Sequence, residues 1–329
     1  MQSVNFTPLL NQVSVSRSKK DYDCKLLPYK KIDCVSVLDA KQKAGWGITA
    51  FDLPKTWQIT QGEGIKIAVL DTGVDLDHPD LVENLLSGIN LISRNEPPED
   101  NNGHGTHVAG ILVASNNDIG MVGVCPKAKV IPVKVLDAKG NGNLFKVADG
   151  IHWAADQGVD FIVMSLGSPM KVQNVRKAIQ YAESKGVVTF CAAGNAGKTK
   201  EVFYPANYEE TIAIGAITED FKRAEFSCTG LNLDFMAPGE NIFSTFPNDW
   251  YTTLSGTSMA CPFAVGVAAL VKSYVKSGKS DIKLETTEDY RDMFRKYSID
   301  INDLDLTNKK FLEGFGIIDP RKLMMNLTS

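Results

Sequence analysis

Residues 65–71, Ile-Lys-Ile-Ala-Val-Leu-Asp, form a short apolar run that ends on one carboxylate, Asp71. Such a run is typical of a buried strand in a parallel sheet. Runs of this kind alternate with helix-like patterns at residues 65–70, 105–114, 130–136, 144–156, 161–166, 172–184, 187–192 and 211–216. The alternation predicts βαβ units in a three-layer α/β fold, with a mainly parallel twisted sheet and helices on both faces.

Three of the predicted strands end on residues suited to chemistry. Asp71 ends the first, residues 165–167 end the strand at 161–166, and Gly194-Asn195 follows the strand at 187–192. In open parallel sheets, ligands bind at the carboxyl ends of the strands. These distant segments are therefore expected to line one crevice.

The composition indicates a globular protein of one large domain or two modest ones, with 329 residues, 43% hydrophobic residues and a net charge of −4. Basic clusters such as residues 17–20 are typical of a solvated tail, so no nucleic-acid partner is expected. Residues 1–23 lack the pattern of a secretion signal, so a cytoplasmic location is expected. Six cysteines without paired metal spacing are predicted to be free thiols: Cys24, Cys34, Cys125, Cys191, Cys228 and Cys261.

The most apolar segment, residues 259–271, is interrupted by Pro262 and Gly266. It is shorter than the roughly 20 residues that cross a bilayer. We therefore predict a buried helix and no membrane partner.

Ser258 stands between small residues, in Gly-Thr-Ser-Met-Ala at 256–260, where this helix begins. The positive end of a helix dipole favours developing negative charge, which suits a nucleophile. A hydroxyl also needs a base to accept its proton and an acid group to orient that base. His104 and Asp71 complete this set, in the chain order Asp, His, Ser.

Three strings carry a resemblance that spans roughly residues 44–320: Ala-Val-Leu-Asp-Thr-Gly at 68–73, Asn-Gly-His-Gly-Thr-His-Val-Ala-Gly at 102–110 and Leu-Ser-Gly-Thr-Ser-Met-Ala at 254–260. They resemble the signatures of the subtilisin-like serine proteases. The resemblance implies Ser258 as nucleophile, His104 as general base and then acid, and Asp71 as the carboxylate that orients the imidazole. It implies a serine endopeptidase that acts on proteins and peptides through an acyl-enzyme on Ser258.

Asn195, in Ala-Ala-Gly-Asn at 192–195, matches the family's oxyanion-hole asparagine. Its amide would act with the backbone N–H of Ser258. An isolated Gly-Asn pair is more typical of a turn. Beside the three signatures, the catalytic interpretation is favoured.

The resemblance further implies a groove to which a substrate peptide adds as a strand. Phe203 falls where family members often carry a small residue near the floor of the primary pocket, so a preference for small or medium side chains before the cut is expected. The implied groove residues are Gly140, Asn141 and Gly142 on one edge, Ser165, Leu166 and Gly167 on the other, Ala192, Ala193 and Gly194 along the primary pocket, and Leu144, Val147 and Leu166 around a distal apolar pocket.

The loop Ser-Asn-Asn-Asp-Ile-Gly-Met at 115–121 resembles the family's strong calcium loop. Ca²⁺ prefers several oxygen ligands. An ordinary polar loop is the alternative that the residues alone leave open. The implied ligands are the side chains of Gln42, Asp80 and Asn117 and the carbonyls of Ser115, Ile119 and Met121.

The other histidines are interpreted as structural. His107 is predicted to make a buried hydrogen bond, and His78 and His152 to be structural or exposed. An HxxH metal site that pairs His107 with His104 is a minor alternative, because no third ligand is evident. Phe263 stands where relatives usually carry His, so the packing behind Ser258 is expected to differ.

Residues 1–44 are polar and charged with one apolar cluster, Leu26, Leu27, Pro28 and Tyr29, and are predicted to be an extension of a catalytic domain at 45–329. The cluster resembles the short leader of bacterial intracellular subtilisins. Proline removes a donor and fixes a backbone angle, so the leader can lie across the groove with its bonds out of register for attack. We expect a zymogen with a tethered inhibitor, at an effective concentration of roughly millimolar. Simple surface packing is the alternative.

A scaffold held closed by its leader is disfavoured by the intact set Asp71, His104, Asn195 and Ser258, and an esterase or lipase by the lack of a G-x-S-x-G elbow. Intracellular relatives imply a homodimer. Residues 1–24, the charged stretch 280–308 and the strand or turn at 314–319 are assigned no chemistry.

Overall fold

The computed structural model describes residues 22–36, 41–198, 201–301 and 309–328, so the basic cluster at 17–20 and most of the segment 1–24 lie outside the described residues. The strands are β1 (Asp23–Leu26), β2 (Lys30–Ser36), β3 (Lys66–Asp71), β4 (Ile89–Asn90), β5 (Lys129–Lys134), β6 (Asn141–Asn143), β7 (Phe161–Met164), β8 (Leu166–Gly167), β9 (Val188–Ala192), β10 (Thr211–Ile217), β11 (Phe235–Pro238), β12 (Ile242–Phe246) and β13 (Trp250–Ser255). The helices are α1 (Trp46–Ala50), α2 (Leu53–Thr56), α3 (His104–Val113), α4 (Leu144–Asp156), α5 (Gln173–Ser184), α6 (Thr257–Tyr274), α7 (Thr287–Tyr297), α8 (Lys309–Glu313) and α9 (Pro320–Thr328), with short helical turns at Val82–Asn84 and Val275–Lys279.

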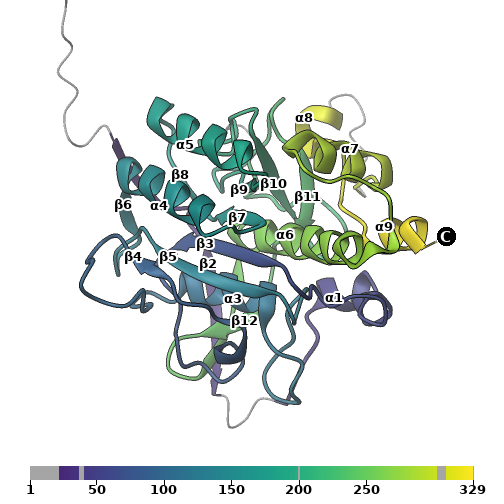
Figure 1. The fold of residues 1–329 in the computed structure, drawn as a ribbon, viewed down its shortest axis with the longest axis horizontal. Helices are drawn as coiled ribbons and strands as arrows, with labels where there is room; N and C mark the ends of the chain where they lie inside the picture. Colours follow the sequence, from purple (N-terminus) through teal and green to yellow (C-terminus); the bar gives the residue numbers. More distant parts are fainter. Residues whose placement is uncertain (1–21, 37–40, 199–200, 302–308, 329) are drawn as a thin grey trace, which may run out of the picture.

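A seven-stranded sheet in the order β11-β10-β9-β7-β3-β5-β4 forms the centre of the molecule, and its strand pairs are parallel. Helices α4 and α5 pack against each other on one face, and α3 packs against α6 on the other (Figure 1). The predicted three-layer α/β architecture is therefore confirmed. The strands β3, β7 and β9 are buried along nearly their whole length, which explains why they appear in the sequence as uninterrupted apolar runs.

Two of the expected strands end earlier than the sequence suggested. The run 161–166 is divided into β7 and β8, because Leu166 and Gly167 leave the central sheet and pair with β1. The run 130–136 stops at Lys134, where the N–H groups of Val135 and Leu136 both donate to the carbonyl of Asp71, at 2.9 and 3.1 Å. Both deviations lie at the carboxyl ends of the strands, beside the predicted crevice.

The predicted buried helix is confirmed, but its predicted length is wrong. Helix α6 runs through Pro262 and Gly266, and every one of its residues except Lys272 is buried. With the turn that follows, the apolar helix spans 23 residues from Thr257 to Lys279, long enough to cross a membrane by length and composition alone, and 89% of its most apolar window is buried inside the protein. Gly266 lets the helix approach its neighbour, because a Cβ there would lie 2.6 Å from Val124.

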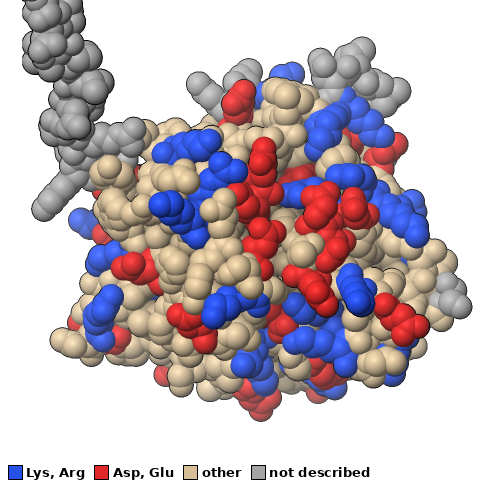
Figure 2. All heavy atoms as spheres, turned by 45° about the horizontal axis from the view of Figure 1, so that its top comes forward, with Lys and Arg blue, Asp and Glu red and all other residues tan. Residues whose placement is uncertain are grey.

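The charged segment after residue 280 contains helix α7, which the sequence pattern did not reveal. Its amino end is a capping box in which Thr286 and Asp289 bond each other's backbone N–H groups. Its buried face carries Tyr290 and Phe294. The expected strand or turn at 314–319 forms single bridges from Ile317 to Met236 and Ile299. On the face shown in Figure 2, acidic and basic side chains are interspersed.

Candidate active site

Asp71 is the last residue of β3, and His104 is the first residue of α3. The two carboxylate oxygens of Asp71 lie 2.9 and 3.0 Å from His104 Nδ1, and both residues are fully buried. A proton on Nδ1 satisfies this pair and leaves Nε2 as an acceptor. His104 Nε2 is buried and has no hydrogen-bond partner in the described part of the chain. The imidazole is therefore oriented to take a proton at Nε2.

The loop before His104 is fixed by Asp100, a residue that the sequence pattern did not single out. Asp100 Oδ1 accepts hydrogen bonds from the N–H of Gly103 and from Thr72 Oγ1, both at 2.9 Å. Gly103 has φ of 110°, and a Cβ there would lie 2.2 Å from the ring of Phe246. Only glycine fits such a position. Gly103, packed on Phe246 and bonded to Asp100, therefore fixes where α3 begins. The turn signal Asp-Asn-Asn-Gly at 100–103 was present in the sequence.

A buried lysine, Lys134, lies at the end of β5 beside the carboxylates of Asp71 and Asp100. Its Nζ donates to the carbonyl of Glu99 at 2.9 Å and to that of Thr72. Burial lowers the pKa of Lys134, while the charges of Asp100 and Asp71 oppose that shift. The ammonium thus offsets part of the negative charge behind His104.

Ser258 is the second residue of α6, and its hydroxyl donates to the carbonyl of Ser165 at 3.2 Å rather than to His104. In return, Ser165 Oγ donates to the carbonyl of Ser258 at 2.9 Å. That carbonyl would normally accept from residue 262, but Pro262 has no N–H. The proposed catalytic roles require hydrogen bonds from Asp71 to His104 and from His104 to Ser258. The structure contains the first of these bonds, but the Ser258 hydroxyl is bonded to the Ser165 carbonyl instead of to His104.

Asn195 lies just past β9 with both ends of its amide engaged. Oδ1 accepts hydrogen bonds from the N–H and the Oγ1 of Thr257, both at 2.8 Å. Nδ2 donates to the carbonyl of Pro28 at 2.7 Å. The hydroxyl of Thr257 also accepts from the N–H of Gly194 at 3.1 Å. Thr257, which the sequence pattern did not single out, therefore aims the Asn195 amide at the groove.

The two predicted edges of the groove flank the segment that carries the apolar cluster Leu26 to Tyr29; residues 22–36 of it are called the leader below, after the prediction from the sequence. Strand β1 is the middle strand of an antiparallel sheet, β6-β1-β8, with Cys24 opposite Gly142 and Leu26 opposite Leu166. The N–H of Leu26 also donates to the carbonyl of Gly140 at 2.9 Å. Residues 23–26 of the chain thus occupy the place of an added peptide strand.

Leu27, the next residue of the leader, is 2% exposed and lies against the predicted groove edge at Gly167. A Cβ on Gly167 would lie 2.8 Å from Leu27 Cδ2 and 3.3 Å from Phe203 Cβ. Phe203 donates its N–H to the carbonyl of Ala193 at 2.9 Å, and its ring lies 3.4 Å from the Cβ position of Gly194. Phe203 therefore contacts both Gly167, which lies against Leu27, and the segment Ala193-Gly194 that is predicted to line the primary pocket. Of the other predicted groove residues, Leu144, Val147, Ser165, Leu166 and Ala192 are buried and Asn141 is half-buried.

Beyond the pocket, the leader crosses the site and leaves along another strand. The ring of Tyr29 packs at 5.2 Å from the ring of His104. Burial, followed by the charges of Asp71 and Asp100, raises the pKa of Tyr29. Residues after Tyr29 form β2, which pairs antiparallel with β13 in the sheet β12-β13-β2.

The predicted calcium residues come together around Asp80. Asp80 Oδ1 accepts from Asn117 Nδ2 at 2.8 Å, and Oδ2 accepts from the N–H of Met121 at 3.1 Å and from Tyr251 at 2.8 Å. Gln42 Nε2 lies 3.0 Å from the carbonyl of Ser115 and 3.5 Å from that of Met121. Ile119 donates its N–H to Asn117 Oδ1 at 3.2 Å. Burial raises the pKa of Asp80.

The other histidines stay outside the site. His107 Nε2 lies 3.1 and 3.2 Å from the carbonyls of Ile242 and Thr252, and burial lowers its pKa to about 3. His78 is buried against Tyr251, and His152 is exposed. Within the described residues, no group of three His, Cys, Asp or Glu side chains could hold a metal ion.

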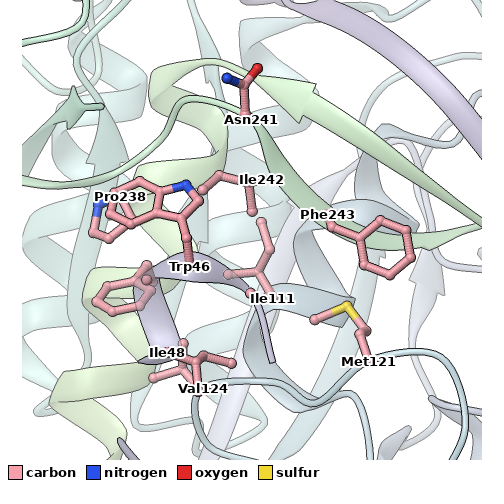
Figure 3. A pocket seen from close by; sticks show the side chains of 12 residues that line it. Trp46, Ile48, Ile111, Met121, Val124, Pro238, Asn241, Ile242 and Phe243 are labelled. Atoms are coloured by element: carbon pink, nitrogen blue, oxygen red, sulfur yellow. The ribbon is translucent and has the colours of Figure 1, made fainter. Parts of the chain in front are cut away.

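A separate apolar hollow of about 70 Å³ lies between α1, α3, β12 and α6 (Figure 3). Trp46, Ile111, Phe243 and Phe263 are among its lining residues. Phe263, noted in the sequence as unusual for its position, therefore faces this hollow. No member of the candidate triad lines it.

Comparison with known proteins agrees with this geometry. Residues 62–316 match the Subtilase family. An "Intracellular serine protease" from Paenibacillus polymyxa is 40% identical over 280 residues, which is 83% of this chain and 84% of that protein. "Thermitase" from Thermoactinomyces vulgaris is 42% identical over 74% of this chain and 88% of its own length, and the "Major intracellular serine protease" of Bacillus subtilis is 39% identical over 83% and 88%. The chain therefore belongs to the subtilase family and is a serine endopeptidase.

Proposed function

We propose that this endopeptidase cleaves peptide bonds through an acyl-enzyme on Ser258, and that the arrangement with the leader in the groove is its zymogen. The observation that carries the proposal is the contact between Asn195 Nδ2 and the carbonyl of Pro28, at 2.7 Å. A segment of the same chain thus occupies the donor that an oxyanion would need.

In the mechanism that this geometry supports, release of the leader frees Ser258 to turn its hydroxyl from the Ser165 carbonyl to His104 Nε2. His104 takes the hydroxyl proton as Oγ attacks the substrate carbonyl, and Asp71 stabilises the imidazolium that forms. Asn195 Nδ2 and the N–H of Ser258 stabilise the oxyanion. His104 then gives the proton to the leaving amine, and a water molecule repeats the sequence to hydrolyse the acyl-enzyme.

The register of the leader supports inhibition rather than cleavage. In this proposal Leu27, which is buried against Gly167, occupies the primary pocket, so the bond after Leu27 would be the one presented for attack. The carbonyl at Asn195 belongs instead to Pro28, one residue further along. Pro28 fixes φ and lacks an N–H, which keeps the reactive carbonyl away from the oxyanion donor. The bound peptide is therefore held in place without being aligned for the reaction.

Proteins and peptides are the proposed substrates, with small or medium side chains before the cut, because the Phe203 side chain lies against both Gly167 and Gly194, which are predicted to line the groove and its primary pocket. A panel of fluorogenic peptides that differ only in the residue before the cut tests both the peptidase activity and the preference for small or medium side chains. We expect Ala and Leu peptides to be cut with a higher kcat/KM than the Phe peptide. Preferred cleavage after Phe or Tyr would contradict the role of Phe203, and absence of any cleavage would contradict the proposed activity.

Cys24 offers a test of leader binding that does not depend on activity. In the bound leader its thiol is buried and its pKa is raised to about 12, chiefly by desolvation, whereas Cys34 is exposed. In the full chain with Ser258→Ala, we expect one thiol to react rapidly with a thiol reagent at pH 8. Adding Leu27→Asp should release the leader and raise the number to two.

Cys24→Ser in the same Ser258→Ala, Leu27→Asp chain is the matched control and should return the number to one. The number of reactive thiols is read by mass spectrometry of the labelled chain. Equal reaction rates of Cys24 and Cys34 with the leader intact would contradict the bound leader.

We also propose a structural Ca²⁺ held by Asp80, by the carbonyls of Ser115, Ile119 and Met121, and by Gln42 and Asn117. The donor set fits a hard cation: Gln42 Nε2 contacts two of these carbonyls at once, and Asn117 Nδ2 contacts Asp80. Rotating both amides by half a turn exchanges each nitrogen for an oxygen. The ion would supply positive charge that favours the ionised form of Asp80.

Removal of calcium is expected to lower the Tm by about 5–10 °C, because binding at about 100 times Kd contributes about 2.7 kcal/mol. Scanning calorimetry of the Ser258→Ala chain with excess chelator measures this without self-digestion. Asn117→Ala should reduce the chelator shift. An unchanged Tm in the chain with Asn117 present would contradict the site.

A cytoplasmic location is proposed because two of the matched proteins are named intracellular. Fractionation of cells that make the full chain tests it, and recovery from the medium without lysis would contradict it. The homodimer stays a prediction that sedimentation velocity can test.

A further inference from the structure

The leader continues past the catalytic residues on the side that would receive the part of a substrate after the cut. Strand β2 places Lys30 opposite Ser255 and Lys31 opposite Leu254, at the end of β13 that leads into Ser258. Because this pairing uses backbone groups of β13, another extended peptide can form it as well.

Lys31 makes a specific side-chain contact from this strand. Its Nζ lies 3.8 Å from the centroid of the Phe246 ring. Phe246 ends β12, and its ring also lies against Gly103, beside His104. The ring face is therefore a cation-binding surface next to the catalytic histidine.

Four carboxylates lie around Phe246, and a cation, the Lys134 ammonium, is bonded to the backbone carbonyl of one of these residues, Glu99. A hollow of about 510 Å³ beside the ring is lined by Asp75, Asp77, Glu99 and Asp100, and no Lys or Arg is among the described residues that line it. Burial, then interaction with Asp77, raises the pKa of Asp75 to about 6, and burial followed by the charge of Asp75 raises that of Glu99. Crowded carboxylates of this kind attract a cation at the mouth of the hollow.

We propose that Phe246 and this acidic hollow form a subsite that selects Lys or Arg at the third residue after the cleaved bond. The position is counted from the oxyanion donor: in a substrate the carbonyl at Asn195 belongs to the cleaved bond, and in the leader, which is shifted by one residue relative to Leu27, it belongs to Pro28. Tyr29, Lys30 and Lys31 therefore lie where the first, second and third residues after the cleaved bond of a substrate would lie. The inference rests on the proposed endopeptidase mechanism and extends it to the far side of the groove. The leader is then a substrate mimic on both sides of the active site.

The test uses the full chain, incubated until its rate of peptide hydrolysis is constant. Quenched-fluorescence peptides carry Leu before the cut and Lys, norleucine or Glu at each of the first five positions after it, and mass spectrometry of the products identifies the cleaved bond. Lys at the third position is expected to raise kcat/KM about fivefold over norleucine, mainly through KM, and Glu to lower it. About 0.5 M NaCl should reduce the advantage of Lys, since the acidic hollow is screened.

Phe246→Leu should bring the ratio of Lys to norleucine rates close to one. The matched control is Tyr297→Leu, which removes a ring contacted by Lys296 at 5.1 Å outside the groove, and it should leave the ratio unchanged. Cleavage of all peptides at equal rates would overturn the subsite alone. Cleavage of none would overturn the proposed mechanism, and the subsite with it.

Discussion

Replacing Ser258 with alanine is expected to lower peptide hydrolysis by about 10⁶-fold, the size of loss that removal of the catalytic serine causes in subtilisin. The reason is chemical: without the hydroxyl, no acyl-enzyme forms, and Asn195 and the groove can only bind substrate. The measurement is kcat for a fluorogenic peptide with the full-length chain. The same variant should keep its leader uncut over time when followed by mass spectrometry.

Ser165→Ala is the matched control, because it removes a hydroxyl that contacts Ser258 but has no proposed part in the reaction steps. It leaves the Ser258 carbonyl without the donor that stands in for the missing N–H of Pro262, so reduced stability is expected with hydrolysis retained. Labelling by a fluorophosphonate should likewise persist in Ser165→Ala and vanish in Ser258→Ala. Labelling or turnover that survives Ser258→Ala would assign the nucleophile elsewhere.

The second large effect is expected at Asn195. Asn195→Asp keeps an oxygen to accept from Thr257 but replaces the Nδ2 donor by an acceptor, so kcat should fall by at least about 10³-fold while KM changes little. Asn195→Ala should lower kcat by about 10²- to 10³-fold, the usual range for loss of one oxyanion donor. Steady-state kinetics with one peptide gives both values.

Thr257 distinguishes positioning from direct stabilisation. Thr257→Val removes the Oγ1 contacts to Asn195 and Gly194 but keeps the backbone N–H, and should lower kcat on the order of tenfold. Thr257→Ser should restore the rate, because the hydroxyl returns. A kcat unchanged by Asn195→Asp would show that this amide does not stabilise the oxyanion.

Much of the central fold follows from local pattern. The predicted helix at 144–156 coincides with α4, and β3 and β10 begin or end within one residue of their predicted limits. These elements are buried on one or both faces, so hydrophobic periodicity specifies them directly. The ends of the strands at 134 and 164 were less predictable, since the bonds that stop them come from the distant residue Asp71 and from the leader.

The length of α6 was misjudged for a related reason. Pro262 and Gly266 normally weaken a helix. Here Ser165 supplies the hydrogen bond that Pro262 cannot, and close packing on Val124 requires the glycine. Both compensations come from other parts of the fold, so local propensity could not reveal them.

The sequence by itself determined the layered α/β fold and pointed to Asp71, His104, Asn195 and Ser258, because strand patterns and short motifs are local properties of the chain. Only the tertiary structure decided that Thr257 and Asp100 position the site, that the Ser258 hydroxyl is bonded to Ser165, and that Lys31 rests on Phe246. These contacts join residues that are far apart along the chain or depend on the choice of a side-chain rotamer. Their formation is set by packing and hydrogen-bond competition across the whole domain, which no local pattern encodes.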